Sequence, residues 1–435
     1  MTLPFSNQYF NGTAGLTQGG WILQATELRC GMQYGSSMLY GGGQWGAPSG
    51  EGPLGQGNGG QIYGQYSPPS GPLAIECQLP VYDSAVEAMV AANFKGSWLA
   101  CAGVANGWGY GRVWTRNDAV CTWQPTQIWQ SPVTSSCVQV RSLLAYTDSV
   151  TGQTYIFAGV DDGNNNGGIF RGTYNSAVPG CLVWNSTPEL ALSATNQGVT
   201  LPQGFSERVM SFCAGTNATG GTSLYATVGI QVWQRIDGAN PTWQLVWTKP
   251  TVPGENSQSG LRGLTASGGN LLVFPEGTDW SVTQLNPASG FAVTWQYNLQ
   301  TLEDQLNEFE TGVNVTYVIG AYNNMASVQI GSTYYGLIGL SICVSSYPAG
   351  TPIYLASASG TGTWLAQAYY LVKNGNNFTL KQIAAQANPT VAPRFMVPYG
   401  STYVMAGGFD YEDYNEVAEY GWGAYDTPSN AVAGA

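Results

Sequence analysis

Short apolar runs alternate with polar turns along most of the chain, and residues 141–189 show this pattern most completely. The apolar runs there are Arg141–Tyr146, Thr154–Val160, Gly168–Tyr174 and Cys181–Trp184, and the turns between them are rich in Gly, Asn, Asp and Pro. Runs of this length separated by such turns predict four β-strands in an antiparallel meander. One meander cannot bury both of its faces, but several packed radially can, so the pattern predicts a β-propeller.

Comparable groups of runs precede and follow this segment, at 95–129, 208–247, 261–297, 317–383 and from 394 to the last residues. We therefore expect an all-β fold, a β-propeller of six or seven four-stranded blades, over residues 85–435. Residues 301–310 are expected to form a helical insertion between blades. Ring closure should pair a terminal strand with the opposite end of the chain, because an open sheet edge invites aggregation.

Residues 1–84 have a different composition. Gly occupies ten of the twenty positions from 41 to 60, with Pro and Ser among them. This composition predicts a Gly-rich N-terminal arm, or a divergent blade built from the runs at 20–28 and 73–81. A phosphate-binding loop is not expected, since no helix follows the glycines.

The composition excludes several classes of function. The 435 residues include no His, which removes His-based acid–base catalysis, His-containing triads and His-ligated metals. The net charge is −12 with only 13 Lys and Arg, so nucleic acid is not an expected partner. No apolar run approaches the roughly 18 residues of a membrane-spanning helix, so no membrane span is expected.

The cysteines and the first residues bear on the compartment. The eight Cys lack zinc-like spacing. Local pairs such as Cys101–Cys121 and Cys137–Cys181 favour disulfides, which form in an oxidising compartment. In the alternative, several of the eight are small buried residues of a reduced protein. Residues 1–11 lack the features of a signal peptide, so we expect release by another route, such as host lysis for a virion component, or a leader outside this sequence. The five N-x-[ST] sequons are about as many as chance gives, so they do not argue for a glycoprotein.

Six segments between residues 138 and 410 have a distinctive sequence: RSLLAYTDSVTG at 141–152, GIFRGTY at 168–174, RVMSF at 208–212, GLRGLTA at 260–266, YVIGAYNNMASV at 317–328 and AGGFD at 406–410. Together they resemble a group of uncharacterised bacterial, secreted β-propeller-like proteins. The resemblance implies the propeller fold and an extracellular setting, but no catalytic residue. It departs at the Gly-rich arm and from Tyr411 onward, where a polar His-containing stretch would be expected.

Four arginines stand at or near the predicted first strands of blades: Arg141, Arg208, Arg262 and Arg394. First strands line the central channel of a propeller, so these side chains should converge at the axis. There they would hold an anion such as a carboxylate or a sugar acid, or they would pair with neighbouring carboxylates and support the ring; the second role is favoured.

Three further groups have weaker signals. Asp162, Asn164 and Asn166 copy the first half of a calcium loop, but Thr173 replaces the bidentate Glu, and a hairpin turn explains the same residues. Calcium is the one cofactor considered. The acidic residues Asp410, Glu412, Asp413, Glu416 and Glu419 would supply carboxylates to a glycoside hydrolase, or form a solvated tail. We expect five tryptophans to pack in the blade core, with a carbohydrate-binding platform as the alternative: Trp98, Trp108, Trp114, Trp123 and Trp129.

The leading hypothesis is a non-catalytic β-propeller that acts as an extracellular surface, fibre or virion component and contacts other protein subunits. It rests on the absent His, the sparse charge and the Gly-, Tyr- and Asn-rich loops. The alternative is a carbohydrate-active enzyme (a hydrolase or lyase), or a lectin, that uses the axial channel.

Overall fold

The fold is all-β, as predicted. The computed structural model describes residues 4–12, 17–18, 21–22, 27–43, 59–133, 136–192, 208–250, 260–275, 280–309, 314–319, 325–346, 355–358, 362–383, 391–411 and 419–435. Over these residues the strands form antiparallel sheets. The helical elements described are α1 (Leu299–Phe309), α2 (Pro428–Ala431) and the short 3-10 turns η1 (Pro179–Cys181) and η2 (Pro287–Ser289). The helix α1 confirms the insertion expected at 301–310.

Units of four antiparallel strands follow one another from the N-terminal side. The first contains β4 (Glu27–Tyr34), β5 (Ser37–Gly43), β6 (Gln61–Gln65) and β7 (Ala74–Gln78). The second contains β8 (Asp83–Phe94), β9 (Ser97–Asn106), β10 (Tyr110–Asn117) and β11 (Gln124–Gln130). The third contains β12 (Val138–Thr147), β13 (Thr154–Asp161), β14 (Gly167–Tyr174) and β15 (Leu182–Trp184), with β16 (Leu190–Ala191) beside β14.

Two similar sheets come next. One contains β17 (Val209–Thr216), β18 (Thr222–Val228), β19 (Gln231–Ile236) and β20 (Thr242–Thr248), and the other β21 (Leu261–Ser267), β22 (Asn270–Pro275), β23 (Ser281–Asn286) and β24 (Ala292–Asn298). A larger sheet follows, with β25 (Asn314–Ile319), β26 (Met325–Ile330), β27 (Thr333–Ser346), β28 (Leu355–Ala358), β29 (Gly362–Asn374) and β30 (Asn377–Gln382). A short separate hairpin joins β2 (Thr17–Gln18) to β3 (Trp21–Ile22).

The last sheet joins the two ends of the chain. It contains β31 (Val391–Tyr399), β32 (Tyr403–Tyr411), β33 (Glu419–Asp426) and, at its edge, β1 (Asn7–Gly12). The pairing of β1 with β33 is antiparallel, and the Phe5 N–H donates to the Asp426 carboxylate at 3.0 Å. This pairing covers the edge of β33, and it confirms that a terminal strand pairs with the opposite end of the chain.

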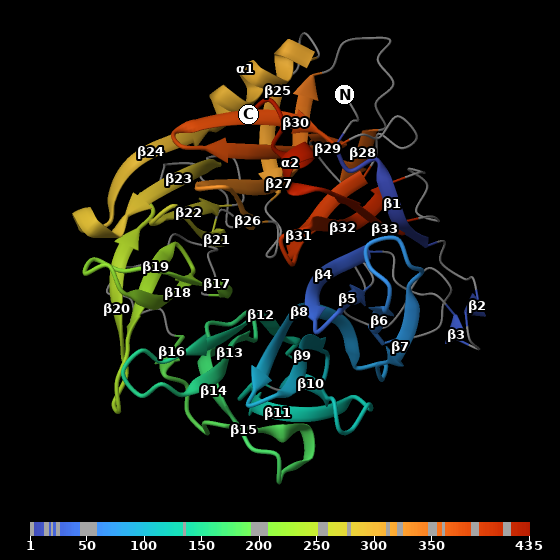
Figure 1. Ribbon diagram of the computed structural model, residues 1–435, viewed down its shortest axis with the longest axis vertical. Helices are drawn as coiled ribbons and strands as arrows, with labels where there is room; N and C mark the ends of the chain where they lie inside the picture. The colour runs from blue at the N-terminus through green and yellow to red at the C-terminus, as the bar shows by residue number, and fades with distance from the viewer. Residues whose placement is uncertain are drawn as a thin grey trace.

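The sheets are arranged around a centre, as Figure 1 shows, and in each sheet except that of β25 to β30 the strand nearest to it is the one that opens the unit. We call β4, β8, β12, β17, β21 and β31 the inner strands. Apolar side chains fill the space between neighbouring sheets: Leu99 and Val113 of the second unit pack with Val140 and Ile156 of the third, and all four are fully buried. The arrangement is that of a β-propeller-like fold, in which a sheet too thin to bury both faces packs against its neighbours.

The N-terminal region contributes a complete four-stranded sheet, β4 to β7, rather than only an arm. The assignment of residues 1–84 as a Gly-rich arm or a divergent blade stays a prediction. Most of the Gly-rich segment, residues 44–58, lies outside the described residues. The predicted boundary between residues 84 and 85 stays a prediction.

Glycines on second strands let adjacent sheets approach closely. A Cβ on Gly103 of β9 would lie 2.6 Å from Cγ1 of Val140, which belongs to the next inner strand. The same arrangement recurs where Gly41 faces Val86 and Gly159 faces Val209. The sheets are thus packed at a distance that leaves no room for a methyl group at these positions.

We expect Gly103→Ala to lower the free energy of unfolding by about 1–3 kcal/mol, because overpacking forces the backbone of β9 away from β12. The matched control is Gly260→Ala, whose Cβ would lie 3.5 Å from its nearest neighbour, the Gly229 carbonyl oxygen. Thermal unfolding of the two variants measures the difference. Equal midpoints would contradict the close packing described here.

Candidate functional site

A β-bulge near the start of each inner strand forms the central feature of the candidate site. The pairing of each of these strands with the second strand of its sheet skips one residue there, and the skipped residues are Arg29, Glu87, Arg141, Met210, Arg262 and Arg394. A bulge changes the direction of the extra residue's side chain, which no longer follows the regular alternation of side chains between the two faces of the sheet. The bulge recurs near the start of all six inner strands, so these six residues hold equivalent positions around the centre. We call them the axial collar.

Some collar side chains contact one another, and others contact a nearby carboxylate. Arg29 on β4 donates to Glu87 on β8, and Arg394 on β31 donates through Nε to Glu27 on β4 at 3.1 Å. Arg262 on β21 contacts Sδ of Met210 on β17 at 3.7 Å. The fourth arginine, Arg141, pairs through Nε with Asp161 of its own sheet at 2.6 Å.

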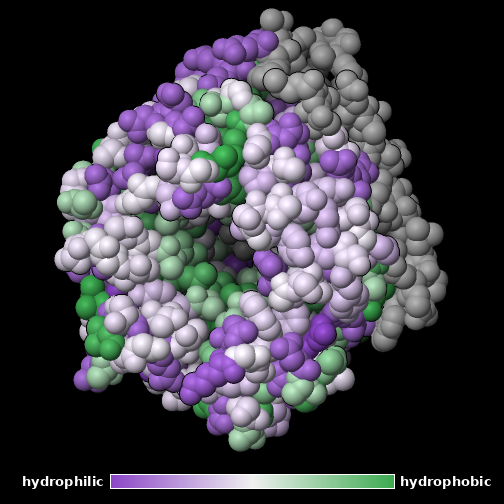
Figure 2. Space-filling view, viewed as in Figure 1, coloured by the Kyte–Doolittle hydropathy of each residue, from purple (hydrophilic) through white to green (hydrophobic). Residues whose placement is uncertain are grey.

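The collar concentrates positive charge in an acidic protein. It holds four of the 13 Lys and Arg residues of a chain whose net charge is −12. The carboxylates in contact with it among the described residues are Glu27, Glu87 and Asp161. Figure 2 shows this face of the molecule hollowed at the centre of the ring. A guanidinium in a partly dehydrated hollow is well suited to bind a carboxylate, sulfate or phosphate group.

The structure places three of the four predicted arginines, Arg141, Arg262 and Arg394, at the bulge position of an inner strand. It places Arg208 two residues before the bulge of β17, where Met210 takes the collar position instead. The role predicted for the cluster, in binding an anion or in supporting the ring, stays a prediction.

Arg29 and Glu87 are collar residues that the sequence analysis missed. The signal for them is a repeated tripeptide, an apolar residue, the collar residue and a small residue, as in Leu28-Arg29-Cys30, Val86-Glu87-Ala88 and Val140-Arg141-Ser142. The apolar member packs toward the preceding sheet, and the small member begins the regular pairing.

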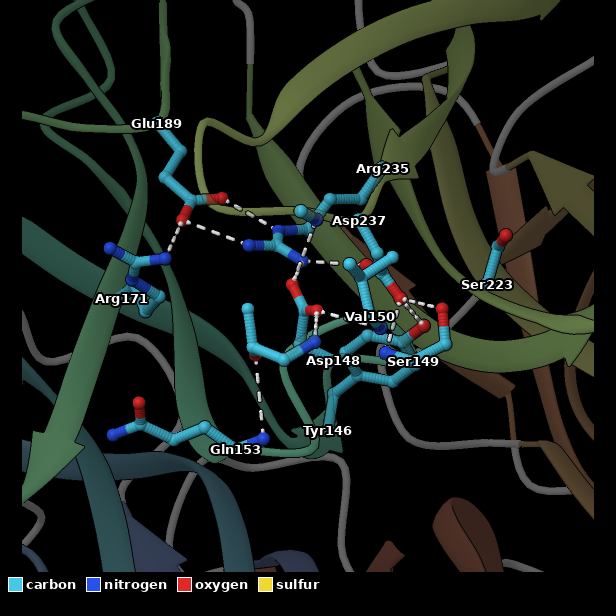
Figure 3. Close-up of polar contacts among 12 residues, drawn as sticks. Tyr146, Asp148, Ser149, Val150, Gln153, Arg171, Glu189, Ser223, Arg235 and Asp237 are labelled. Atoms are coloured by element: carbon cyan, nitrogen blue, oxygen red, sulfur yellow. Dashed lines mark hydrogen bonds and ion pairs between the residues drawn. The ribbon is translucent and has the colours of Figure 1, made fainter.

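A second group of charged side chains joins the third and fourth sheets, and Figure 3 shows it. Arg235 on β19 is fully buried and donates to Glu189 at 2.9 Å, to Asp148 at 2.8 Å and to Asp237 at 2.6 Å. The Tyr146 hydroxyl on β12 donates to Asp237 at 2.6 Å. Asp148 and Glu189 belong to the third unit and Arg235 to the fourth, so these bonds bridge the two sheets. We call this group the Arg235 clamp.

The same clamp occurs between the first and second sheets. Arg116 donates to both oxygens of Glu76 at 2.7 Å, Trp123 Nε1 donates to Glu76 at 3.0 Å, and the Tyr34 hydroxyl donates to Asp118 at 2.5 Å. Trp243 Nε1 likewise donates to Glu189 at 3.3 Å in the Arg235 clamp. The two clamps show that charged residues away from the axis hold neighbouring sheets together.

Asp148 makes the stability of the Arg235 clamp sensitive to acid. Burial acts to raise the pKa of the Asp148 carboxyl, but hydrogen bonds from Arg235 and from the backbone N–H groups of Thr151, Gly238 and Val150 lower the pKa well below its usual range. A depressed folded-state pKa contributes stability that is complete above the unfolded pKa of about 3.9 and is lost as the pH falls below it.

We therefore expect the wild-type chain to lose more stability than Asp148→Asn when the pH is lowered from about 5 to about 3, since the amide does not titrate. Thermal midpoints of both proteins across this range measure the effect. Parallel pH profiles would show that Asp148 does not contribute.

The predicted calcium ligands form a hydrogen-bonded turn between β13 and β14. The Asp162 carboxylate accepts from Ser131 Oγ at 2.7 Å, from the Asn164 N–H at 2.8 Å and from Asn166 Nδ2 at 3.0 Å. Burial acts to raise the pKa of Asp162, but these donors hold it below its ordinary value. No group of three or more acidic or Cys side chains in the described part of the chain is placed to hold a metal ion. A calcium site here stays a prediction.

The acidic candidates are placed only in part. Asp410 lies in β32, opposite Tyr420 of β33. Glu412, Asp413 and Glu416 lie outside the described residues. Their assignment as catalytic carboxylates stays a prediction.

The cysteines and tryptophans are placed more fully. Seven cysteines are described, and all are free thiols, so the pairs Cys101–Cys121 and Cys137–Cys181 are not formed. Trp123 is buried, whereas Trp108 is 54% exposed. No helix in the described ranges is both long and apolar enough to cross a membrane.

Comparisons with known proteins give likenesses to solved structures. No family model matches the chain, and no curated protein matches it. Among solved structures, the chain is similar to a serine-to-alanine variant of puromycin hydrolase complexed with PGG, with 10% sequence identity and a TM-score of 0.44. The match covers 88% of this chain and 50% of that one, so it spans about half of the hydrolase chain.

This comparison corrects the leading prediction from sequence. The named solved structure is that of an enzyme, whereas the leading prediction was a non-catalytic surface, fibre or virion component, and that prediction is not proposed again. No residue, substrate or mechanism of puromycin hydrolase is transferred to this chain.

Proposed function

We propose that this chain is a carbohydrate-active enzyme, a hydrolase or lyase, that binds an acidic sugar at the centre of a seven-bladed β-propeller. The seven blades are the five four-stranded units from β4 to β24, the sheet around β27 and β29, and the closing sheet of β31, β32, β33 and β1. The observation that carries the proposal is the axial collar, in which one bulge per inner strand gathers guanidinium groups around one opening.

The ligand class follows from the chemistry of the collar. A guanidinium offers parallel N–H donors that match the two oxygens of a carboxylate. Uronic acids carry a carboxylate on each sugar ring, so several guanidinium groups around one hollow suit a short run of such rings. The net charge of −12 disfavours nucleic acid as the source of the anion.

The two reaction types make different demands on the chain. A lyase removes the proton beside the carboxylate, and an arginine paired with that carboxylate stabilises the negative charge that develops. A hydrolase needs an acid and a base or nucleophile, commonly two carboxyl groups. The candidates for that pair are Asp410, Glu412, Asp413 and Glu416. Neither reaction requires His, which the chain lacks.

The test is incubation of the full chain with uronic-acid polysaccharides and with neutral polysaccharides, followed by product analysis. We expect cleavage of an acidic polymer. A lyase product contains a new carbon–carbon double bond conjugated to the carboxylate, which absorbs in the ultraviolet, whereas a hydrolase product contains only a new reducing end. Binding of an acidic polymer without any product would leave a lectin and contradict the enzyme.

A further inference from the structure

Two exposed aromatic side chains lie against each other on the second sheet. Trp108 is 54% exposed and Tyr82 is 39% exposed, and their rings are in contact at an interplanar angle of 31°. Tyr82 precedes β8 and Trp108 lies in the turn from β9 to β10. Among the tryptophans described by the structure, Trp108 is the one whose side chain is exposed rather than packed between sheets.

The pair lies at the same end of the ring as the axial collar. Tyr82 immediately precedes the inner strand β8, and the collar residue Glu87 is near the start of that strand. At about 3.3 Å per residue, the five residues between Tyr82 and Glu87 span roughly 17 Å at most. A sugar chain that reaches the collar from this side can therefore pass over the two rings.

Buried hydrogen bonds hold the backbone under both rings. The Gly107 N–H donates to the Tyr82 carbonyl at 2.9 Å, which ties the two turns together. Asn106 is fully buried, and its side-chain oxygen accepts from the N–H of Trp108 at 3.0 Å and of Tyr110 at 3.2 Å. Its Nδ2 donates to the buried Asp83 at 2.7 Å. The rings are thus presented on a backbone that is ordered before any ligand binds, which lowers the entropic cost of binding.

Hydrogen bonds connect a turn of the third sheet to the turn that holds Trp108. Ser131 connects the two regions, since its N–H donates to the Gly109 carbonyl at 2.8 Å and its hydroxyl donates to Asp162 at 2.7 Å. Asn164, in the same turn as Asp162, is exposed. Asn164 thus lies in a turn that Ser131 links to the backbone at Gly109, next to Trp108, and amides donate to and accept from sugar hydroxyls.

We propose that Tyr82 and Trp108 form a sugar-stacking subsite, which binds a pyranose ring of the same polysaccharide next to the rings that occupy the collar. The ligand class rests on the proposed function. Two rings are far smaller than the roughly 800 Å² per partner of a specific protein interface, but they match the face of one or two sugars. An exposed aromatic pair does not contribute to the packed core, and exposed apolar groups that lie together commonly mark a binding site.

The test compares Trp108→Ala and Tyr82→Ala with the wild-type full chain in calorimetric titrations with uronic-acid oligosaccharides and with neutral cello-oligosaccharides. We expect Trp108→Ala to weaken binding about tenfold and Trp108→Phe to restore most of it, because stacking needs an aromatic face rather than an indole. The control is Tyr334→Ala. Tyr334 is also exposed, at 46%, but it follows the turn from β26 to β27, which lies at the opposite end of the strands from Tyr82 and Trp108.

Unchanged affinity in Trp108→Ala would overturn the subsite, and so would failure of every oligosaccharide to bind the wild-type chain. A loss of affinity that is equal in Tyr334→Ala would also overturn it. The proposed function fails separately: binding that depends on Trp108 without any cleavage would retain the subsite and reject the enzyme. Cleavage that is indifferent to Trp108 would reject the subsite and retain the enzyme.

Discussion

Arg235→Met is expected to lower the free energy of unfolding by about 3–5 kcal/mol, the cost of breaking a buried ion pair by removing one partner. The side chain is fully buried and contacts Asp148, Glu189 and Asp237, whose side chains are at most 6% exposed. Methionine fills similar volume but leaves three carboxylates without their common cation. Because this loss is a large fraction of the about 5–15 kcal/mol that stabilises a typical protein, we expect partial unfolding at physiological temperature.

Two further variants make this prediction specific to the clamp. Arg235→Lys keeps the charge but loses the planar fork, so its stability should lie between those of the wild type and Arg235→Met. Arg171→Gln removes a cation whose side chain is 21% exposed and which pairs with Glu189 at 3.1 Å, so it should cost about 1 kcal/mol or less. Thermal unfolding monitored by circular dichroism ranks the three. Equal losses in Arg235→Met and Arg171→Gln would show that the clamp does not hold the sheets together.

The collar yields the largest expected effect on activity. The double variant Arg29→Gln, Glu87→Gln removes an interacting cation and anion together, so it changes no net charge. It eliminates the guanidinium of Arg29. The Arg29 side chain is 16% exposed, whereas those of Arg141 and Arg394, the other collar arginines in described ion pairs, are 9% exposed or less. We expect kcat/KM on an acidic polysaccharide to fall about a hundredfold, the effect of removing one charge-stabilising donor from an active site.

Single substitutions test whether the charge of the collar causes that effect, because they should change the affinity in opposite directions. Glu87→Gln alone removes a negative charge from the collar, so acidic oligosaccharides should bind more tightly and the affinity should depend more steeply on salt. The matched variant away from the centre is Arg171→Gln, which should leave kcat/KM unchanged. If Glu87→Gln weakens binding as much as the double variant does, then the collar acts by supporting the ring rather than by holding an anion.

The periodic part of the sequence predicted the fold well because each sheet repeats the same alternation of apolar runs and Gly- or Asn-rich turns. The turn at Lys95 and Gly96 illustrates this, since both residues have positive φ and join the paired residues Phe94 and Ser97. The pairing of β1 with β33 followed from the need to cover a sheet edge. The N-terminal sheet was harder to recognise, because the glycines between residues 41 and 60 interrupt the rhythm of its strands.

The candidate site was only partly predictable. Arg141, Arg262 and Arg394 were found because they begin apolar runs, but the position of a bulge depends on pairing with the second strand, which a single run does not reveal. Arg208 was chosen in place of Met210 for this reason. The clamps show the same limit: Arg235 and Asp237 are close in sequence, whereas Glu189 and Asp148 reach them only through the packing of neighbouring sheets.

The most direct test of the central claim is the affinity of the full chain for a uronic-acid oligosaccharide and for the same oligosaccharide with its carboxyl groups reduced to alcohols, each titrated at low and high salt. We predict that the acidic ligand binds more tightly, that its affinity falls as salt rises, and that the affinity of the reduced ligand does not depend on salt. Equal affinity for the two ligands, or no binding of the acidic one, would contradict a collar that recognises carboxylates.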